Sequence, residues 1–413
     1  MLTAFNNKIY MLVFILVFIY ACKSDQSNDS AKRDVNNNIN NKVEKASRNL
    51  KDLAKNLNQE SDFLKFPRSL NKSGNIKLVN TSDWTSGFYP GVLWLMHDLT
   101  KDSYWKNNAV IFTNALEIEQ NNSLDHDIGF KMMSSFGLGY KYTKDPHYRD
   151  VLIHSAKTLV TRFNPNVGCI RSWDHHKDKW EFPVIIDNLM NLELLFWAWK
   201  ETGDEDFYNV ASTHAKTTLK NHFREDYSSY HVVNYDTVSG AAIHKATHQG
   251  FSDNSSWARG EAWALYGYTM AYRETSDIQF LIQAEAIANY IINIALLPQD
   301  LVPLWDFSLN SAEGEPKDAS AAAIMASALF ELSTMTKTNS KEYLNVANGI
   351  IESLSSDNYF NIQGENKGFL LKHSTGSKPK NLEVDVPLIY ADYYFLEALS
   401  RQIKITTNKT IAL

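Results

Sequence analysis

Two aspartates stand at the starts of apolar segments, where a carboxyl group can serve as an acid. Asp187 lies in "FPVIIDNLMNLELLFWAWK", in which most neighbours are apolar, and Asp127 lies in "HDIGF". Burial disfavours the charged form of a carboxyl group and raises its pKa, and a second carboxylate nearby raises it further. Paired acids of this kind donate a proton and activate water in glycoside hydrolysis.

Helix capping is the ordinary alternative for both aspartates. Each precedes a predicted helix, so each side chain is placed to accept a backbone N–H as an N-cap. Asp187 is predicted to be a cap by position and an acid by environment, because the two roles are compatible.

Arg259 and Trp263 are four residues apart in "SSWARGEAWALYGY" and share one face of a predicted helix. An arginine beside free helix N–H groups is suited to hold an external carboxylate. The alternative is an ion pair with Asp253 or Glu261. His231 suits either a metal or a hydrogen bond, and the absence of a second ligand at a spacing such as HExxH favours the hydrogen bond.

Ten tryptophans and twenty tyrosines supply many flat apolar faces. Most such rings fill cores, but sugar-binding clefts also use them. Trp84 and Trp173 stand in long predicted loops, as does Gln249, and loops often carry functional groups.

The elements that must position these residues are helical. Apolar residues recur at helical spacing in about twelve segments: 41–58, 88–99, 103–120, 129–143, 146–163, 188–202, 204–220, 256–275, 277–296, 318–336, 341–355 and 387–403. Short and long links alternate, which predicts six helical hairpins closed into an all-α (α/α)6 barrel. Short strands are expected in the long loops, in "HVVNYD", "VGCIRSWDHH" and "KWEFPVI". We expect one barrel domain over residues 43–413.

The N-terminus has the pattern of an export signal. Lys8 precedes the apolar run "MLVFILVFIYAC", which ends at Cys22 and resembles a bacterial lipobox. Residues 1–22 are therefore predicted to be a signal peptide with lipidation at Cys22, and polar residues 23–42 a disordered tether. The alternative is an ordinary signal peptide with another cleavage site. We expect a cell-envelope lipoprotein, on the periplasmic face or the cell surface, that meets the membrane only through this anchor.

Charge and cysteine content exclude several classes of protein. A net charge of −6 and a pI near 6.1 argue against nucleic-acid binding. Cys169 is the only other cysteine, so neither an intrachain disulfide after lipidation nor a cysteine-based zinc site is expected. The sequence does not indicate an oligomeric state.

Four motifs carry a family resemblance. "TSGFYPGVLW", "HDIGF", "IIDNLMNLELL" and "SSWARGEAWALYGY", in this order over residues 80–400, resemble the unsaturated glucuronyl hydrolases, glycoside hydrolase family 88. The resemblance implies an (α/α)6 barrel that removes a 4,5-unsaturated uronic acid from the non-reducing end of polysaccharide-lyase products. Its implied chemistry is protonation of C4 of the vinyl ether and addition of water at C5.

The resemblance also implies residue roles. Asp187 would be the general acid and then the base for water, and Asp127 its partner. Three tryptophans would stack on or flank the sugar: Trp84, Trp173 and Trp263. Three further residues would lie around the uronate and the attacking water: His231, Gln249 and Arg259. No metal or organic cofactor is implied.

The loop "HSTGSKPK" resembles one in which some members contact a sulfate on the adjacent sugar. Ser374, Ser377 and Lys378 have the donors for it, and a flexible polar loop is the alternative. The sulfate interpretation predicts substrates from ulvan or from glycosaminoglycans.

Three other functions remain open at this level. One is an unsaturated rhamnogalacturonyl hydrolase acting on pectin fragments. The second is an inverting (α/α)6 glycosidase acting on saturated glycans. The third is a non-catalytic, lipid-anchored glycan-binding protein, which would not need two aspartates in one cleft.

Overall fold

The computed structural model describes residues 37–57, 64–295 and 297–407 of the 413-residue chain. The predicted signal peptide, Cys22 and residues 23–36 of the predicted tether lie outside the described residues. Residues 37–42 are helical and belong to a helix that runs to residue 57. Ile39 and Lys42 are buried, so the prediction of a disordered tether is wrong for residues 37–42.

Six helical units form an inner ring in the described part of the chain. They are α2 (Phe88–Thr100), α4 to α5 (Ile128–Met132, η2 Met133–Gly137, Leu138–Thr143), η3 with α7 (Ile186–Asn191, Leu192–Thr202), α9 (Ala258–Thr275), α11 (Ala319–Leu332) and α13 (Ile389–Thr406). Each unit contacts the next, and α13 contacts α2, so the ring is closed. All residues of α11 are buried, as expected for a helix packed on every side.

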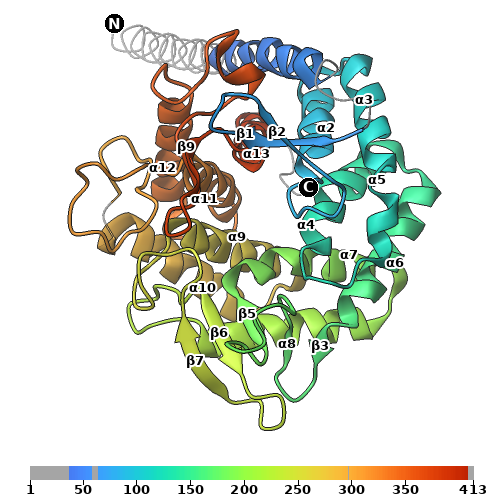
Figure 1. The fold of residues 1–413 in the computed structure, drawn as a ribbon, viewed down its shortest axis with the longest axis vertical. Coiled ribbons are helices and arrows are strands. Elements are labelled where there is room, and N and C mark those ends of the chain that lie inside the picture. The colour runs from blue at the N-terminus through green and yellow to red at the C-terminus, as the bar shows by residue number, and fades with distance from the viewer. Residues whose placement is uncertain (1–36, 58–63, 296, 408–413) are drawn as a thin grey trace, which may run out of the picture.

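Six amphipathic helices surround this ring. They are residues 37–57, α3 (Ser103–Asn114), α6 (Pro146–Val160), α8 (Glu205–Asn221), α10 (Ile278–Asn289) and α12 (Ser340–Leu354). Outer and inner helices alternate along the chain, and the colours of Figure 1 run once round the ring. The helix of residues 37–57 contacts the connection between α12 and α13, where the Asn49 side chain donates to the backbone carbonyl of Asn361 at 2.7 Å. The predicted (α/α)6 barrel is confirmed.

Local sequence signals explain where the outer helices begin. Four aspartates each accept the backbone N–H two residues ahead and so cap the helix that follows: Asp102, Asp145, Asp204 and Asp277. Pro146 occupies the first turn of α6, as predicted.

Short antiparallel strands lie in the long connections. They form the hairpin β1–β2 (Phe66–Leu70, Ile76–Val79), the pair β3–β4 (Phe163–Asn164, Cys169–Ile170), the sheet β5–β6–β7 (Pro183–Ile185, Val232–Tyr235, Ala242–Ala246) and the hairpin β8–β9 (Ser374–Ser377, Leu382–Val386). The predicted strands correspond to β4, β5 and β6. The hairpins β1–β2 and β8–β9 were not expected from the sequence, and they contact each other through β1 and β9.

No helix in the described segments combines the length and apolarity needed to cross a membrane.

Candidate active site

A cavity of about 440 Å³ lies at the barrel end where the inner helices begin. Its walls include Trp84 just before α2, Asp127 at the N-cap of α4, Asp187 in η3, Arg259 in α9 and Tyr390 in α13. Helix N-termini carry partial positive charge and unpaired N–H groups. The cavity therefore favours an anionic ligand.

Asp187 is placed as an acid rather than as a cap. The N-cap of η3 is Ile185, so the prediction that Asp187 caps a helix is wrong. Its Oδ2 is buried and has no hydrogen-bond partner among the described residues. Burial raises the pKa of Asp187 to about 7, although the Arg259 guanidinium acts in the opposite direction. Such a group holds a proton near neutral pH and can give it up.

Asp127 lines the same cavity. It occupies the N-cap position of α4 but makes no side-chain capping bond, which leaves its carboxyl group free for other contacts. Burial raises its pKa well above the usual range, and the charges of Asp125 and Asp187 act in the same direction, whereas Lys131 lowers it. Both acids therefore line one cavity, and the structure brings the predicted pair together.

His231 lies beside Asp187. Its Nε2 is 3.6 Å from Oδ2 of Asp187. Its Nδ1 accepts the backbone N–H groups of His248 and Gln249, both at 3.2 Å, so the ring proton sits on Nε2. Burial holds the pKa of His231 well below its usual value, so the ring is neutral.

Arg259 reaches the cavity wall, but protein groups occupy its guanidinium. Nη1 binds Asp318 at 2.7 Å and also donates to the carbonyl of Thr375, and Nη2 donates to the carbonyl of Gly376 at 2.5 Å. Neither partner considered from the sequence is used, since the bonded acid is Asp318. Arg259 thus joins α9 to α11 and β8, and it adds positive charge beside Asp187.

Two of the three predicted tryptophans line the cavity. Trp84 packs against Tyr390 with ring centroids 4.9 Å apart, and Trp173 stacks on His175 at 5.3 Å. Trp263 does not line it. It is buried behind Phe130, with centroids 5.1 Å apart, and so supports the wall instead of meeting a sugar.

The loop "HSTGSKPK", residues 373–380, only partly lines the cavity. Gln249 and Ser377 line it, and Gln249 donates to the carbonyl of Gly376 at 3.0 Å. Ser374 is buried in β8 and is not part of the lining. Lys378 is also outside it and lies 4.0 Å from Glu315. The lysine that reaches the cavity is Lys380.

Sequence reasoning missed several lining residues. Lys380 contacts Nε2 of His248 at the outer rim. Arg68 faces the cavity from β1, bonded to Asp83 at 2.9 Å and to Glu383 at 2.6 Å. A basic residue in a predicted long loop was the available signal for Lys380, but no local signal marks Arg68.

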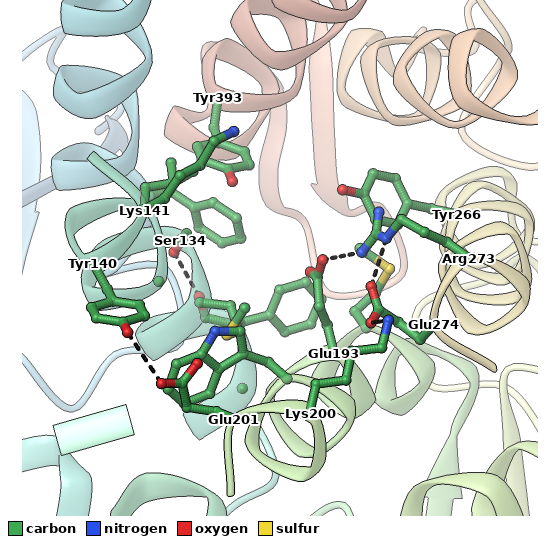
Figure 2. A pocket seen from close by; sticks show the side chains of 18 of the residues that line it. Ser134, Tyr140, Lys141, Glu193, Lys200, Glu201, Tyr266, Arg273, Glu274 and Tyr393 are labelled. Atoms are coloured by element: carbon green, nitrogen blue, oxygen red, sulfur yellow. Dashed lines mark hydrogen bonds and ion pairs between the residues drawn. The ribbon is translucent and has the colours of Figure 1, made fainter. Parts of the chain in front are cut away.

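A second cavity of about 470 Å³ lies at the opposite end of the barrel, where the inner helices end. Figure 2 shows Arg273 between Glu193 and Glu274 and Lys200 beside Glu274, whereas Lys141 lies apart from them. Arg273 contacts Glu193, and Lys200 pairs with Glu274 at 2.7 Å. Its acids are paired with cations, whereas Oδ2 of Asp187 in the first cavity has no hydrogen-bond partner among the described residues.

No cluster of three or more His, Cys, Asp or Glu side chains suited to a metal ion occurs within residues 37–57, 64–295 and 297–407.

The comparison with known families agrees with this geometry. The model of Glycosyl Hydrolase Family 88 matches residues 62–401. The chain belongs to glycosyl hydrolase family 88. A family 88 relative, the unsaturated glucuronyl hydrolase of Formosa agariphila, is 53% identical over 82% of this chain and 84% of that protein. The unsaturated chondroitin disaccharide hydrolase of Streptococcus agalactiae is 33% identical over 87% of this chain and 90% of that protein.

Solved family 88 structures share the fold. An unsaturated glucuronyl hydrolase specific for heparin superimposes with a TM-score of 0.86 at 47% identity, covering 90% of this chain and 99% of that one. The enzyme from Streptococcus agalactiae complexed with dGlcA-GalNAc6S gives a TM-score of 0.73 at 30% identity, over 89% of this chain and 92% of that one. The chain is thus a glycoside hydrolase with the architecture of its family.

Proposed function

We propose that the protein removes a 4,5-unsaturated uronic acid from the non-reducing end of oligosaccharides made by polysaccharide lyases. The observation that carries this proposal is that two buried acids with raised pKa values, Asp187 and Asp127, line one cavity built from helix N-termini. The helix ends suit the carboxylate of a uronic acid. The raised pKa of Asp187 suits protonation of a carbon–carbon double bond.

The reaction follows from these positions. Protonated Asp187 transfers its proton to C4, and positive charge develops at C5 and the ring oxygen. The Asp187 carboxylate then takes a proton from water as the water oxygen bonds to C5. The resulting hemiketal opens, and the hemiacetal that this leaves at C1 releases the next sugar. Proton transfer by a positioned group of this kind contributes about 10²–10⁴-fold to a rate.

Asp127 and His231 support this sequence. Asp127 lines the same cavity, where its carboxyl group is placed to bind ring hydroxyls of the sugar. His231 presents a neutral N–H toward Asp187. Trp84 and Trp173 supply flat faces on the walls.

The outer half of the cavity favours a sulfated second sugar. Lys380, His248, His175 and Ser377 line the cavity, and both histidines pack against Trp173. An ammonium group and hydroxyl or imidazole donors suit a sulfate. We therefore assign glycosaminoglycan-type lyase products as the substrate class, in line with the heparin and chondroitin specificities of the relatives. Ulvan fragments stay a prediction from the sequence.

An exported, lipid-anchored form is part of the proposal. Its support is the sequence pattern alone, an apolar run that ends at Cys22 and is followed by polar residues. Labelling of cells with a palmitate analogue would show lipid on the parent and none on Cys22→Ser.

The decisive test of the chemistry compares an unsaturated disaccharide with its saturated counterpart. Release of the reducing-end sugar from the unsaturated compound alone is expected, because only its double bond can accept a proton at C4. Equal release from both would instead indicate an ordinary glycosidase. An unsaturated galacturonyl–rhamnose disaccharide is the control for the pectin-directed alternative.

A further inference from the structure

Two motif residues have no part in the chemistry described so far. Gly129 belongs to "HDIGF" beside Asp127, and Asn191 belongs to "IIDNLMN" beside Asp187. Asn191 is fully buried and ends η3, the short helix that begins at the acid. It faces α4, the helix that follows Asp127.

The Asn191 amide has one orientation. Its Oδ1 accepts the backbone N–H of Phe130 at 2.7 Å, and an N–H group needs an oxygen there. The Nδ2 group therefore faces Nδ1 of His126, at 3.3 Å. Because Nδ2 can only donate, Nδ1 of His126 must accept.

The His126 ring carries its single proton on the other nitrogen. Burial lowers the pKa of His126 to about 3, so the ring is neutral, with Asn188 as a further hydrogen-bonding neighbour and Arg162 as the nearby cation. Its Nε2 lies 3.3 Å from Oδ1 of Asp127. The protonated nitrogen thus lies beside the carboxyl group that partners Asp187.

Gly129 makes this bridge sterically feasible. A Cβ atom on residue 129 would come within 2.6 Å of the Asn191 side chain and within 2.5 Å of its Cα. Contacts that short do not occur between carbon atoms in folded proteins, so the helices of the two acids approach closely only with glycine at this position.

We propose that Asn191 is a positioning residue, which holds His126 with its proton on Nε2 toward Asp127 and ties the helices of the two acids together. The catalytic consequence rests on the proposed function, but the ring tautomer does not. Asp127 has a neutral N–H donor 3.3 Å from its carboxyl oxygen and gains no positive neighbour from His126. It is thereby oriented while still able to share a proton with Asp187.

The direct test is nitrogen NMR of histidine in the full chain, which distinguishes the two neutral tautomers and the cation. His126, assigned by its loss in His126→Gln, is expected as the neutral Nε2–H form. A ring protonated on Nδ1, donating to Asn188, would overturn the proposal, as would a charged ring.

Asn191→Asp tests the consequence, because it keeps an oxygen for Phe130 N–H and removes the donor to His126. We expect the ring proton to move to Nδ1 and kcat to fall by about tenfold or more, a part of the 10²–10⁴-fold that a placed acid supplies, with KM changed less than about threefold. Asn234→Asp is the matched control, since Asn234 is also buried and its Oδ1 accepts the N–H of Phe182 at 2.9 Å. It should leave the tautomer and kcat unchanged.

The outcomes separate the two proposals. A shifted tautomer with unchanged kcat would overturn the positioning role and leave the function intact. Absence of any hydrolysis by the parent would overturn the proposed function, while the tautomer result would still stand. If Asn191→Asp fails to fold, the ring state in the parent decides the proposal alone.

Discussion

The imidazole of His231 directs a neutral N–H toward Asp187, with Nε2 3.6 Å from Oδ2. Two backbone N–H groups hold its other nitrogen, so the ring cannot present a lone pair to the acid. A charged histidine would stabilise the ionised carboxylate and lower its proton affinity. The neutral ring leaves Asp187 able to keep a proton near neutral pH.

The activity should therefore fall as the pH rises through about 7. Protonated Asp187 is the acid that starts the reaction, and burial raises its pKa to about 7. Below this pH the acid form is present, and above it the carboxylate cannot donate. A profile of kcat/KM against pH measures this alkaline limb. A limb that starts only above pH 9 would contradict the assignment, and His231 cannot produce the limb because its pKa lies well below 6.5.

Asp187→Asn should stabilise the protein at alkaline pH. The folded-state pKa of about 7 lies above the ordinary 3.8, so the folded chain holds a proton that the unfolded chain has released. The contribution of this group to the free energy of unfolding is fully present below pH 4 and is lost as the pH rises to 7. The loss is roughly 4 kcal/mol, at 1.36 kcal/mol per pKa unit.

Thermal unfolding of parent and Asp187→Asn at two pH values checks this stability effect. We expect similar Tm values near pH 4 and a variant that is higher by a few degrees at pH 8. Equal Tm values for the two proteins at both pH values would show that burial does not raise the pKa of the Asp187 carboxyl group.

Arg259→Met should destabilise the fold, because it leaves Asp318 buried without its cation. Removing one partner of a buried pair costs about 3–5 kcal/mol, and the contacts with the Thr375 and Gly376 carbonyls are lost too. Denaturant unfolding measures the loss. The double variant with Asp318→Asn should recover part of it, whereas a raised KM at full stability would show that Arg259 serves the substrate instead.

Lys380→Met should weaken the use of sulfated substrates. Lys380 lines the outer cavity, and Lys378, two residues earlier, does not. We expect kcat/KM to fall about tenfold or more for a 6-sulfated disaccharide, the loss of one charge-assisted contact of about 1.5–3 kcal/mol, and little for the unsulfated one. Lys378→Met is the matched control and should resemble the parent. Equal losses of kcat/KM in Lys380→Met and Lys378→Met would contradict the assignment of Lys380 to a sulfate.

The ring of helices could be predicted because it depends on local patterns. Apolar spacing located the segments, and aspartate and proline signals such as Asp145 and Pro146 located helix starts. The first helix began outside its predicted limits. Its polar start "NNNINN" resembles a linker, yet Ile39 is buried, a tertiary contact that composition does not reveal.

The parts of the site that could not be predicted from the sequence depend on contacts between distant segments of the chain. Arg68 meets Glu383 across 315 positions, between two hairpins that the sequence did not predict. In β9, Glu383 and Asp385 have φ values of 54° and 57°, a left-handed backbone that is uncommon for residues other than glycine, so no local signal marks the strand. Trp263 was wrongly predicted to meet the sugar because it shares a helix face with Arg259. One helical turn, about 5.4 Å, separates the two residues along the helix, and a shared face does not reveal this separation.

The most direct measurement is the loss of ultraviolet absorbance of the C4=C5 bond in an unsaturated glycosaminoglycan disaccharide. The parent and Asp187→Asn should be run side by side at pH 6, where the acid is protonated. We expect steady decay with the parent and decay slower by at least about 10²-fold with the variant, the contribution of a general acid. Equal decay with both folded proteins would contradict the assignment of Asp187 as the proton donor.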